Sequence, residues 1–408
     1  MAELKASPEI RFAGFMVNWE LRNLGKLGTT FSGLSGKTKE DFGHGAAEFI
    51  TYMNIFSNPI ADLNGTERVE FDSNQDGVRY GDVFFTTSSE TPEEVGMSSI
   101  WLGNRPNVYL NSFCFGWRPA EKFDSYYLAF MLRSSAIRKK FIFLAQGISR
   151  YNISKTKVME MNVPVPKLDE QGQIGSFFLY LDNHINLHRR QYDKTVNIKK
   201  AMLEKMFPKD GAYSPEIRFA EFTDVWKYRK LDDLLIEYDN KVQGGEYLIA
   251  TSSRQGIFLQ AEYFDGARSR INESLTFHLV PENYVTYRHM SDDSTFHFNQ
   301  NTLKTSILVS KEYPVFTSSA ESDIGFVLYH LNNSPHFMAF SHMQKLGGTR
   351  VRLYYKVLKE YKLLTPTVPE QKRICEFFSN LDHLIVLHQR ELTKLQNLKK
   401  SLLEKMFI

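Results

Sequence analysis

Few residue patterns in this 408-residue chain have the types and spacing needed for chemistry. His184 and His188 have the i, i+4 spacing of two zinc ligands on one helix face, but Ile185 stands where a metalloprotease carries glutamate. The stretch 36–38 reads Gly-Lys-Thr, like the end of a phosphate-binding loop, yet Phe31 occupies the position of the first glycine. We therefore expect no metal site, no nucleotide site and no catalytic residues in this chain.

A second group of candidates is polar and lies in short loops between strand-like segments. Such side chains can contact nucleic acid, because Lys, Arg, Ser and Thr bind phosphates while Arg, Lys, Asn and Gln read base edges. In the first half we single out Ser35, Lys37, Lys39, Thr87, Ser88, Gln146, Ser149, Arg150 and Asn152. In the second half we single out Ser253, Arg254, Gln255, Arg268, Arg270, Arg288, Lys345, Thr349, Arg350 and Arg352. The alternative, that any one of these loops is simply solvated, stays open.

The composition is that of an ordinary globular protein, with 42% hydrophobic and 24% charged residues. A net charge of +3 permits nucleic acid as a partner without requiring it. The two cysteines, Cys114 and Cys375, cannot build a disulfide framework or a zinc site, and their scarcity fits a reducing compartment. The N-terminus does not resemble a signal peptide, and no apolar run is long enough to span a membrane. We expect a cytoplasmic protein with at least two domains.

The elements that must position these loops are set by a long repeat. Residues Glu170–Phe207 recur at Glu370–Phe407, an offset of 370 − 170 = 200, with 20 of 38 positions identical. In both copies apolar residues alternate four and three apart, which is typical of the seam of a coiled coil. The residues expected to pair the helices are Leu181, Ile185, His188, Leu381, Ile385, His388, Leu392 and Leu395. Two amphipathic helices, each packed on its own domain, remain the alternative.

A shorter repeat precedes each long one. The peptide Ser7–Phe15 recurs at Ser214–Phe222, and Trp19 recurs as Trp226. The chain is therefore two units of leading peptide, variable region and long helix. We expect the leading peptide to be structural. The variable regions favour strands with some helix, including one helix over 125–145 capped by Ser125, and their interiors share no alignment except that Gly147 and Arg150 recur as Gly347 and Arg350.

The leading peptide and long helix form a repeated frame around two different variable regions. Such a scaffold presents two non-identical surfaces, which suits the two half-sites of a DNA duplex. The residues also resemble the specificity subunit of type I restriction-modification enzymes. The PEIRF motif with its tryptophan is typical of that family, as are VPVPKLDEQ before the first helix, LTPTVPEQ before the second, and LKKSLLEKMF at the end. The resemblance covers the whole chain and recurs in both halves.

This resemblance implies an α+β fold in which two mixed α/β target-recognition domains are joined by two long helices, forming an antiparallel intramolecular coiled coil with a pseudo-twofold internal repeat. It places recognition domains at 1–163 and 211–365 and the helices at 164–210 and 366–408. Each domain would read one part of an asymmetric, interrupted sequence in double-stranded DNA. The helices would set the spacer and dock two methyltransferase (modification) subunits.

The resemblance also assigns the chemistry to partners. The modification subunits would bind S-adenosylmethionine and methylate adenine, and restriction subunits would add ATP- and Mg-dependent translocation and cleavage. The chain itself has neither the Asn/Asp-Pro-Pro-aromatic motif of adenine methylation nor a Pro-Asp dipeptide that could begin a nuclease motif. We therefore expect a non-catalytic subunit without a cofactor of its own. The alternatives are a coiled-coil adaptor with two domains for ligands other than DNA, and an enzyme with its site in the variable regions.

Overall fold

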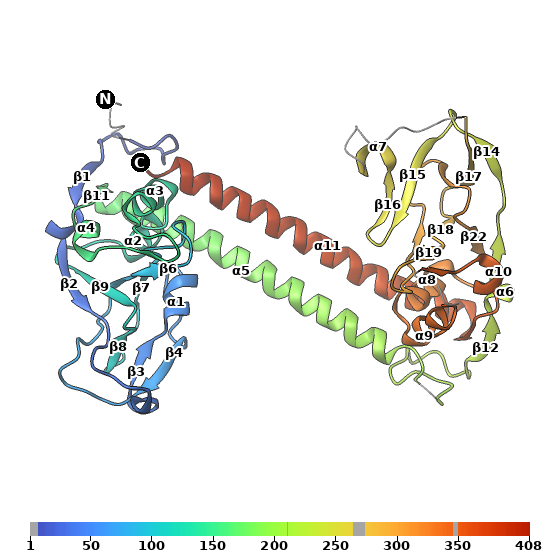
Figure 1. Ribbon diagram of the computed structural model, residues 1–408, viewed down its shortest axis with the longest axis horizontal. Helices are drawn as coiled ribbons and strands as arrows, with labels where there is room; N and C mark the ends of the chain where they lie inside the picture. The colour runs from blue at the N-terminus through green and yellow to red at the C-terminus, as the bar shows by residue number, and fades with distance from the viewer. Residues whose placement is uncertain (1–6, 210, 264–273, 346–349) are drawn as a thin grey trace. The chain divides into compact units, whose positions relative to one another are not determined.

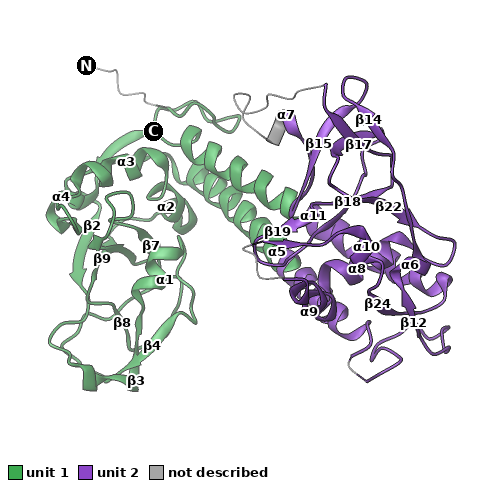
Figure 2. Cartoon of the chain, turned by 45° about the vertical axis from the view of Figure 1, so that its right-hand side comes forward, with its two compact units in different colours: residues 1–191, 388–408 green, residues 192–387 purple. Residues whose placement is uncertain are grey.

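The computed structural model describes residues 7–209, 211–263, 274–345 and 350–408. The chain separates into two compact units, which Figure 2 colours separately. Unit 1 comprises residues 1–191 and 388–408, and unit 2 comprises residues 192–387. Each unit thus holds one variable region together with parts of both long helices. Within the described ranges, no helix has the length and apolar character needed to cross a membrane.

Unit 1 is built on two small sheets with the strand orders β2-β9-β5-β7 and β4-β3-β8 (Figure 1). Two further strand pairs, β1-β11 and β6-β10, lie outside these sheets. The strands are β1 (Glu20–Asn23), β2 (Gly28–Ser32), β3 (Phe42–Ile50), β4 (Thr66–Val69), β5 (Val83–Thr86), β6 (Ser88–Ser89), β7 (Ser98–Ile100), β8 (Val108–Leu110), β9 (Cys114–Pro119), β10 (Tyr151–Asn152) and β11 (Asn162–Val165). The helices are η1 (Leu24–Lys26), η2 (Lys39–Asp41), α1 (Tyr52–Ser57), α2 (Ser125–Met131), α3 (Ser135–Leu144), α4 (Lys155–Met159) and the first part of α5 (Leu168–Lys205).

Unit 2 has a four-stranded sheet with the order β13-β22-β18-β20, a five-stranded sheet with the order β14-β17-β21-β15-β16, and two separate pairs, β12-β24 and β19-β23. Its strands are β12 (Lys227–Lys230), β13 (Leu235–Glu237), β14 (Lys241–Gln243), β15 (Leu248–Ser253), β16 (Gly256–Leu259), β17 (Thr276–Val280), β18 (Val285–Tyr287), β19 (Met290–Ser291), β20 (Phe298–Gln300), β21 (Ile307–Ser310), β22 (Val315–Ser318), β23 (Val351–Arg352) and β24 (Lys362–Thr365). Its helices are α6 (Leu231–Leu234), α7 (Gln260–Tyr263), α8 (Ile324–Asn333), α9 (Pro335–Met343), α10 (Tyr355–Leu358) and the first part of α11 (Val368–Lys405).

The variable interiors are more alike than their sequences indicate. In both units a two-residue strand that follows an inner strand of the four-stranded sheet, β5 or β18, pairs antiparallel with a strand just before the last short helix, as β6-β10 and as β19-β23. The next residue then anchors the pair, because the amide of Ile153 donates to the carbonyl of Thr87 and that of Leu353 donates to His289. The two interiors therefore share this strand pair, which directly follows the aligned residues Arg150 and Arg350, although their sequences show little other alignment.

The prediction of a single helix over 125–145 was wrong, because this segment forms two helices, α2 and α3. Asp124, not Ser125, caps α2 by accepting a hydrogen bond from the amide of Tyr127 at 2.8 Å. Ser134 then adopts an extended backbone and caps α3 through the amide of Ile137. A serine that accepts this amide bond starts a new helix rather than continuing the old one. Unit 2 has the same break at Ser334, between α8 and α9.

The two long helices pack together, as the fold class predicted, and they run antiparallel. Within unit 1, His188 of α5 faces His388 of α11 with 3.1 Å between their Nδ1 atoms, and Asp182 pairs with Lys399. Within unit 2, the same two helices are joined by the ion pair of Lys199 with Asp382. The alternative of two independent amphipathic helices is therefore wrong.

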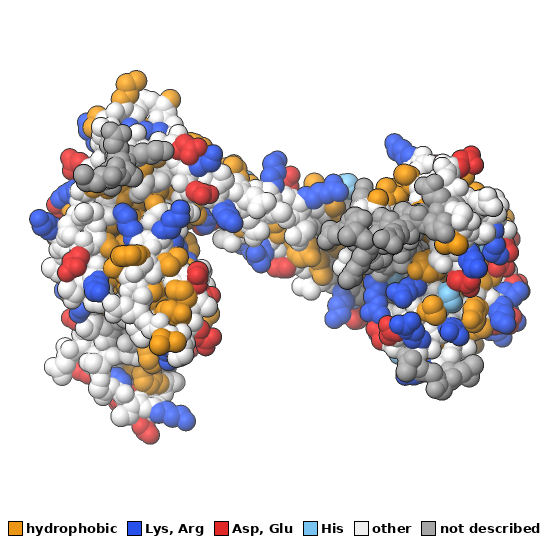
Figure 3. All heavy atoms as spheres, turned by 45° about the horizontal axis from the view of Figure 1, so that its top comes forward, with side chains coloured by type: hydrophobic (Ala, Val, Ile, Leu, Met, Phe, Trp, Pro, Cys, Tyr) orange, Lys and Arg blue, Asp and Glu red, His pale blue; other side chains and the backbone are white. Residues whose placement is uncertain are grey.

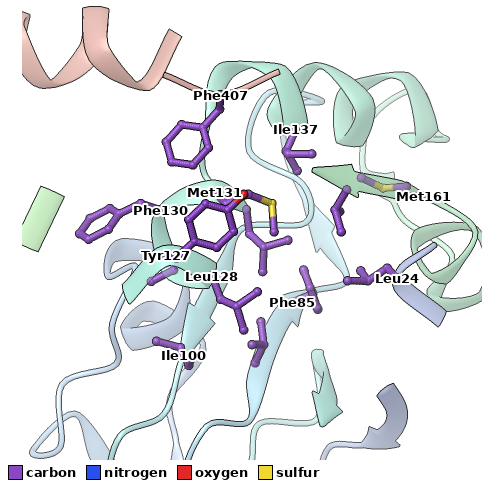
Figure 4. Packing of buried hydrophobic residues seen from close by; sticks show 14 of the residues in the cluster. Leu24, Phe85, Ile100, Tyr127, Leu128, Phe130, Met131, Ile137, Met161 and Phe407 are labelled. Atoms are coloured by element: carbon purple, nitrogen blue, oxygen red, sulfur yellow. The ribbon is translucent and has the colours of Figure 1, made fainter. Parts of the chain in front are cut away.

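The far end of each long helix inserts an aromatic side chain into a recognition domain. In unit 1, Phe407 after α11 packs against Tyr127, with their ring centroids 5.9 Å apart (Figure 4). It also packs against Trp19 and Phe178, with ring centroids 6.4 and 5.6 Å away. In unit 2, Phe207 after α5 meets Trp226, Phe326 and Phe378 in the same way. The core of each unit thus contains residues from both copies of the long repeat.

The leading peptides connect these cores to the helices. Arg11 forms a two-pronged ion pair with Glu170 at 2.7 and 2.8 Å, and Trp19 donates to the same carboxylate at 3.1 Å. The side chain of Glu170 is 2% exposed. Arg218, Trp226 and Glu370 repeat this network in unit 2. The motif recurs because a buried carboxylate needs a charged partner and further hydrogen bonds.

Candidate nucleic-acid interface

A cleft of about 670 Å³ opens on the recognition domain of unit 2. Four of the residues singled out from the sequence line it together, namely Ser253, Arg254, Gln255 and Arg288. They come from the turn between β15 and β16 and from the end of β18. Figure 3 shows basic and acidic side chains interspersed over the face of the molecule that it presents.

Arg254 and Gln255 form the two-residue turn of the β15-β16 hairpin. Ser253 pairs with Gly256 across the turn, and the Ser253 hydroxyl accepts the amide of Gln255 and donates to the carbonyl of Gly256. Gly256 has φ of 128°, a conformation that side-chain-bearing residues rarely adopt. This turn therefore projects the two long polar side chains from a hairpin whose backbone is fixed by its own hydrogen bonds.

The loop after β19, part of which lines the cleft, carries a carboxylate that holds Arg254. Asp293 accepts hydrogen bonds at one oxygen from Arg254 Nη2 at 2.5 Å, from the Ser291 hydroxyl at 2.8 Å and from the Thr295 amide at 3.0 Å. The Arg254 contact is the largest of the causes that hold the pKa of Asp293 well below its usual range. Asp293 is thus ionised at neutral pH and is fixed by its own loop.

A second arginine reaches the same loop from a distant part of the sequence. Ser291 of β19 pairs with Val351 of β23, and Arg350 Nε lies 2.8 Å from Asp292 Oδ1. The structure therefore brings the predicted residues Arg350 and Arg352 to the strand and loop that follow the predicted Arg288. Arg352 is exposed on β23 and Lys345 is exposed after α9. Arg268, Arg270 and Thr349 lie outside the described residues.

His297 also lines this cleft, and its surroundings favour the neutral imidazole. Burial is the main cause that lowers the pKa of its imidazole below the ordinary value. Its Nδ1 lies 3.1 Å from the side-chain oxygen of Asn299. An uncharged ring in this position offers hydrogen bonding without attracting phosphate, which suits contact with a base edge better than contact with the DNA backbone.

Unit 1 has the corresponding strand pair with a different lining. Tyr151 and Asn152 of β10 pair with Ser89 and Ser88 of β6, so the predicted loops 86–89 and 146–152 meet. Gly147 has φ of 144°, and a Cβ on it would lie 2.0 Å from the carbonyl oxygen of Arg150. A side chain at position 147 would therefore clash with its own loop, which explains the glycine there. Gln146, Ser149, Arg150 and Asn152 are all exposed on it.

Several unit 1 residues that were predicted to contact nucleic acid are instead buried or bonded to other parts of the protein. Ser88 is buried and the Thr87 hydroxyl donates to the carbonyl of Phe113 at 2.8 Å. Lys37 lies between Asp41 and Asp72, and its side chain is 11% exposed. Loop 33–39 packs against the turn at 72–76, where the backbone of Ser35 bonds the side chain of Gln75, while Lys39 stays exposed. The structure does not join this loop to the β6-β10 pair.

Sequence reasoning missed Asp292, Asp293 and His297, because acidic residues and a single histidine carry no nucleic-acid signal alone. The available signal was proximity along the chain, since both aspartates directly follow the predicted segment with Arg288.

The residues expected to pair the helices lie along the contact between α5 and α11. Leu181 and Leu395 belong to the core of unit 1, Leu381 packs on the core of unit 2, and Leu392 is buried. Ile185, His188, Ile385 and His388 are partly buried at the middle of the helices. Their neighbours on the outer faces are exposed, which is the pattern that a two-helix seam produces.

Comparison with known proteins gives a consistent picture. The family model described as "Type I restriction modification DNA specificity domain" matches residues 16–196 and 224–397. The MjaX type I restriction enzyme specificity subunit of Methanocaldococcus jannaschii is 24% identical over 95% of this chain and 92% of its own length. The MjaVIII specificity subunit of the same organism is 22% identical over 69% of this chain and 68% of its own. The crystal structure of the type I restriction-modification system S subunit from M. genitalium shares the fold, with a TM-score of 0.61 and 13% identity over 98% of this chain and 99% of that one. None of these matches supports an adaptor for ligands other than DNA.

Proposed function

Because this chain belongs to the type I restriction-modification DNA specificity family, we propose that it is a specificity subunit whose two variable regions each read one half of an asymmetric, bipartite duplex site. The single observation that carries this proposal is the repetition of one frame around two differently lined surfaces. The β6-β10 pair presents Ser149 and Arg150, whereas the β19-β23 pair adjoins the cleft that contains Arg254 and His297. Two equivalent positions with different side chains suit two different half-sites.

The long helices are proposed to set the spacer and to dock two methyltransferase subunits. Each unit supports the docking role, because apolar side chains lie on the outer faces of the helices, away from the seam. In unit 1, Leu187 and Leu398 are 41% and 44% exposed. In unit 2, Val386 and Leu387 are 46% and 44% exposed. Apolar residues at such positions suit burial by partner helices.

The chemistry then belongs to the partners. S-adenosylmethionine would bind the modification subunits, and ATP and Mg would serve restriction subunits. This chain would contribute DNA recognition and assembly in the cytoplasm, as a non-catalytic subunit.

The test is an exchange of one reader. The β1-β11 pair belongs to the frame, since Asn23 pairs with Asn162, so residues 25–161 form the replaceable segment. We expect that replacing them with the corresponding segment of another specificity subunit changes one half-site and leaves the other intact. The measurement is sequencing of methylated adenines in cells that carry the chimera and its methyltransferase.

The reciprocal exchange of residues 232–361, inside the β12-β24 pair, is the matched control and should change only the other half-site. A folded chimera in which one exchange altered both half-sites would contradict the assignment of one reader to each half-site.

A further inference from the structure

We infer that Arg254 reads a guanine in the half-site of unit 2, and that Asp293 is the residue that positions its guanidinium for that contact. This inference rests on the proposed function, because it names the base that one of the two readers recognises. It assigns Arg254 to a base edge rather than to phosphate, and it gives a role to an acidic residue on a surface that faces a polyanion.

The geometry of the pair leaves most of the guanidinium available. Within the described parts of the chain, the hydrogen bonding of Arg254 is confined to Nη2, which donates to one oxygen of Asp293. The side chain of Arg254 is 59% exposed at the tip of its hairpin. A guanidinium has five N–H donors in a rigid fork, and two of them match the O6 and N7 acceptors of guanine in the major groove.

Asp293 is itself held firmly, so it can fix the direction of the Arg254 guanidinium. Ser291 and Thr295 bind the carboxylate from either side along the loop. Between them Ser294 adopts φ of 65°, is 4% exposed, and has its carbonyl held by the hydroxyl of Ser341 at 2.8 Å. The loop therefore anchors Asp293 to helix α9, and the Arg254 side chain loses less freedom when it meets a base.

The net charge of the Arg254–Asp293 pair indicates that Arg254 contacts a base rather than a phosphate. A carboxylate 2.5 Å from the guanidinium cancels most of its charge and would itself repel a nearby phosphate. A neutral pair in a fixed direction is a poor phosphate ligand, but it retains the hydrogen-bond geometry that base reading needs. Arg288 lines the same cleft and is exposed, which makes it the natural comparison for an arginine that contacts phosphate.

The experiment uses the complex of this chain with its methyltransferase subunits and duplexes in which each base pair of the unit 2 half-site is replaced in turn. We expect Arg254→Ala to remove the preference at one G·C pair, by about ten- to a hundred-fold, and to keep the preferences at the other positions. The matched control Arg288→Ala should weaken binding to all duplexes by a similar factor. If Arg254 only holds the hairpin against the loop, Arg254→Ala will weaken binding to all duplexes equally. That result would overturn the inference.

Two further measurements test the contact and the positioning role. Replacing the guanine by 7-deazaguanine removes the N7 acceptor, so it should weaken binding by the native complex and have little further effect on Arg254→Ala. Asp293→Asn should reduce the preference at the same base pair, and the double variant should be no weaker than Arg254→Ala. Equal losses at every position, or additive losses in the double variant, would contradict a positioning role.

Failure of the inference is distinguishable from failure of the proposed function. If exchanging residues 232–361 leaves the whole recognised sequence unchanged, unit 2 is not a reader and the proposed function fails. If that exchange changes a half-site that contains no G·C pair, or if Arg254→Ala keeps every preference, the proposed function stands and the inference about Arg254 fails.

Discussion

At the scale of single residues, the recognition domains are fixed to their frame by charges that solvent barely reaches. Glu170 accepts from both Arg11 and Trp19, and Glu370 repeats this arrangement with Arg218 and Trp226. These partners compensate the cost of burying the carboxylate. A substitution that removes the carboxylate leaves the partners unpaired.

We expect Glu170→Gln to lower the free energy of unfolding by about 3 kcal/mol, because it leaves the half-buried guanidinium of Arg11 without its counter-charge. The control is Glu121→Gln, which breaks the exposed pair of Arg22 with Glu121, where the side chains are 33% and 46% exposed. That loss should be below about 1 kcal/mol. Urea unfolding of the isolated chain measures both, and equal effects would mean that burial does not set the strength of these pairs.

At the scale of elements, each long helix ends as part of a recognition domain rather than as a free terminus. Phe407 is 4% exposed and packs among three aromatic rings, while the amide of Ile10 donates to the carbonyl of Lys405 at 3.0 Å. The leading peptide therefore closes the end of the helix that enters its domain.

We expect Phe407→Ala to destabilise the protein by about 3–5 kcal/mol, because it leaves a cavity between Trp19, Tyr127 and Phe178. Phe143→Ala is the matched control. Phe143 lies on α3 and is 87% exposed, so its removal should change stability by less than about 0.5 kcal/mol. Thermal unfolding compares the two, and a small effect at position 407 would show that the end of α11 is not needed by the core of unit 1.

At the scale of the whole molecule, the proposed spacer function makes helix length a quantitative variable. We expect seven residues inserted after position 191 and seven after position 387 to preserve the heptad register while adding about 10 Å to each helix, at 1.5 Å per residue. Duplex DNA rises about 3.4 Å per base pair, so the spacer should lengthen by up to about 3 base pairs. Both half-sites should stay the same.

Sequencing of methylated adenines measures the spacer of that variant directly. The control replaces exposed residues of the same helix segments with alanine and keeps the length, so it should keep the spacer. An active complex with inserted helices and an unchanged spacer would mean that the helices dock partners without measuring DNA.

The sequence by itself determined the two-unit organisation and the pairing of α5 with α11. A heptad pattern depends only on residues three and four apart, so it could be recognised along 170–207 and 370–407 without knowledge of the rest of the chain. The recurrence of Arg11, Trp19 and Glu170 likewise marked the frame, although their mutual contacts were not visible. The family resemblance followed from the same short motifs and is confirmed by the family match.

Only the tertiary structure decided which polar loops belong together. Arg254 and Asp293 are far apart in the sequence and form an ion pair because the β15-β16 hairpin and the loop after β19 converge. Loop 33–39 has the composition of a contact loop but is held against the turn at 72–76. Long-range strand pairing sets these positions, and no local pattern of residue types encodes which distant segment a two-residue strand will pair with.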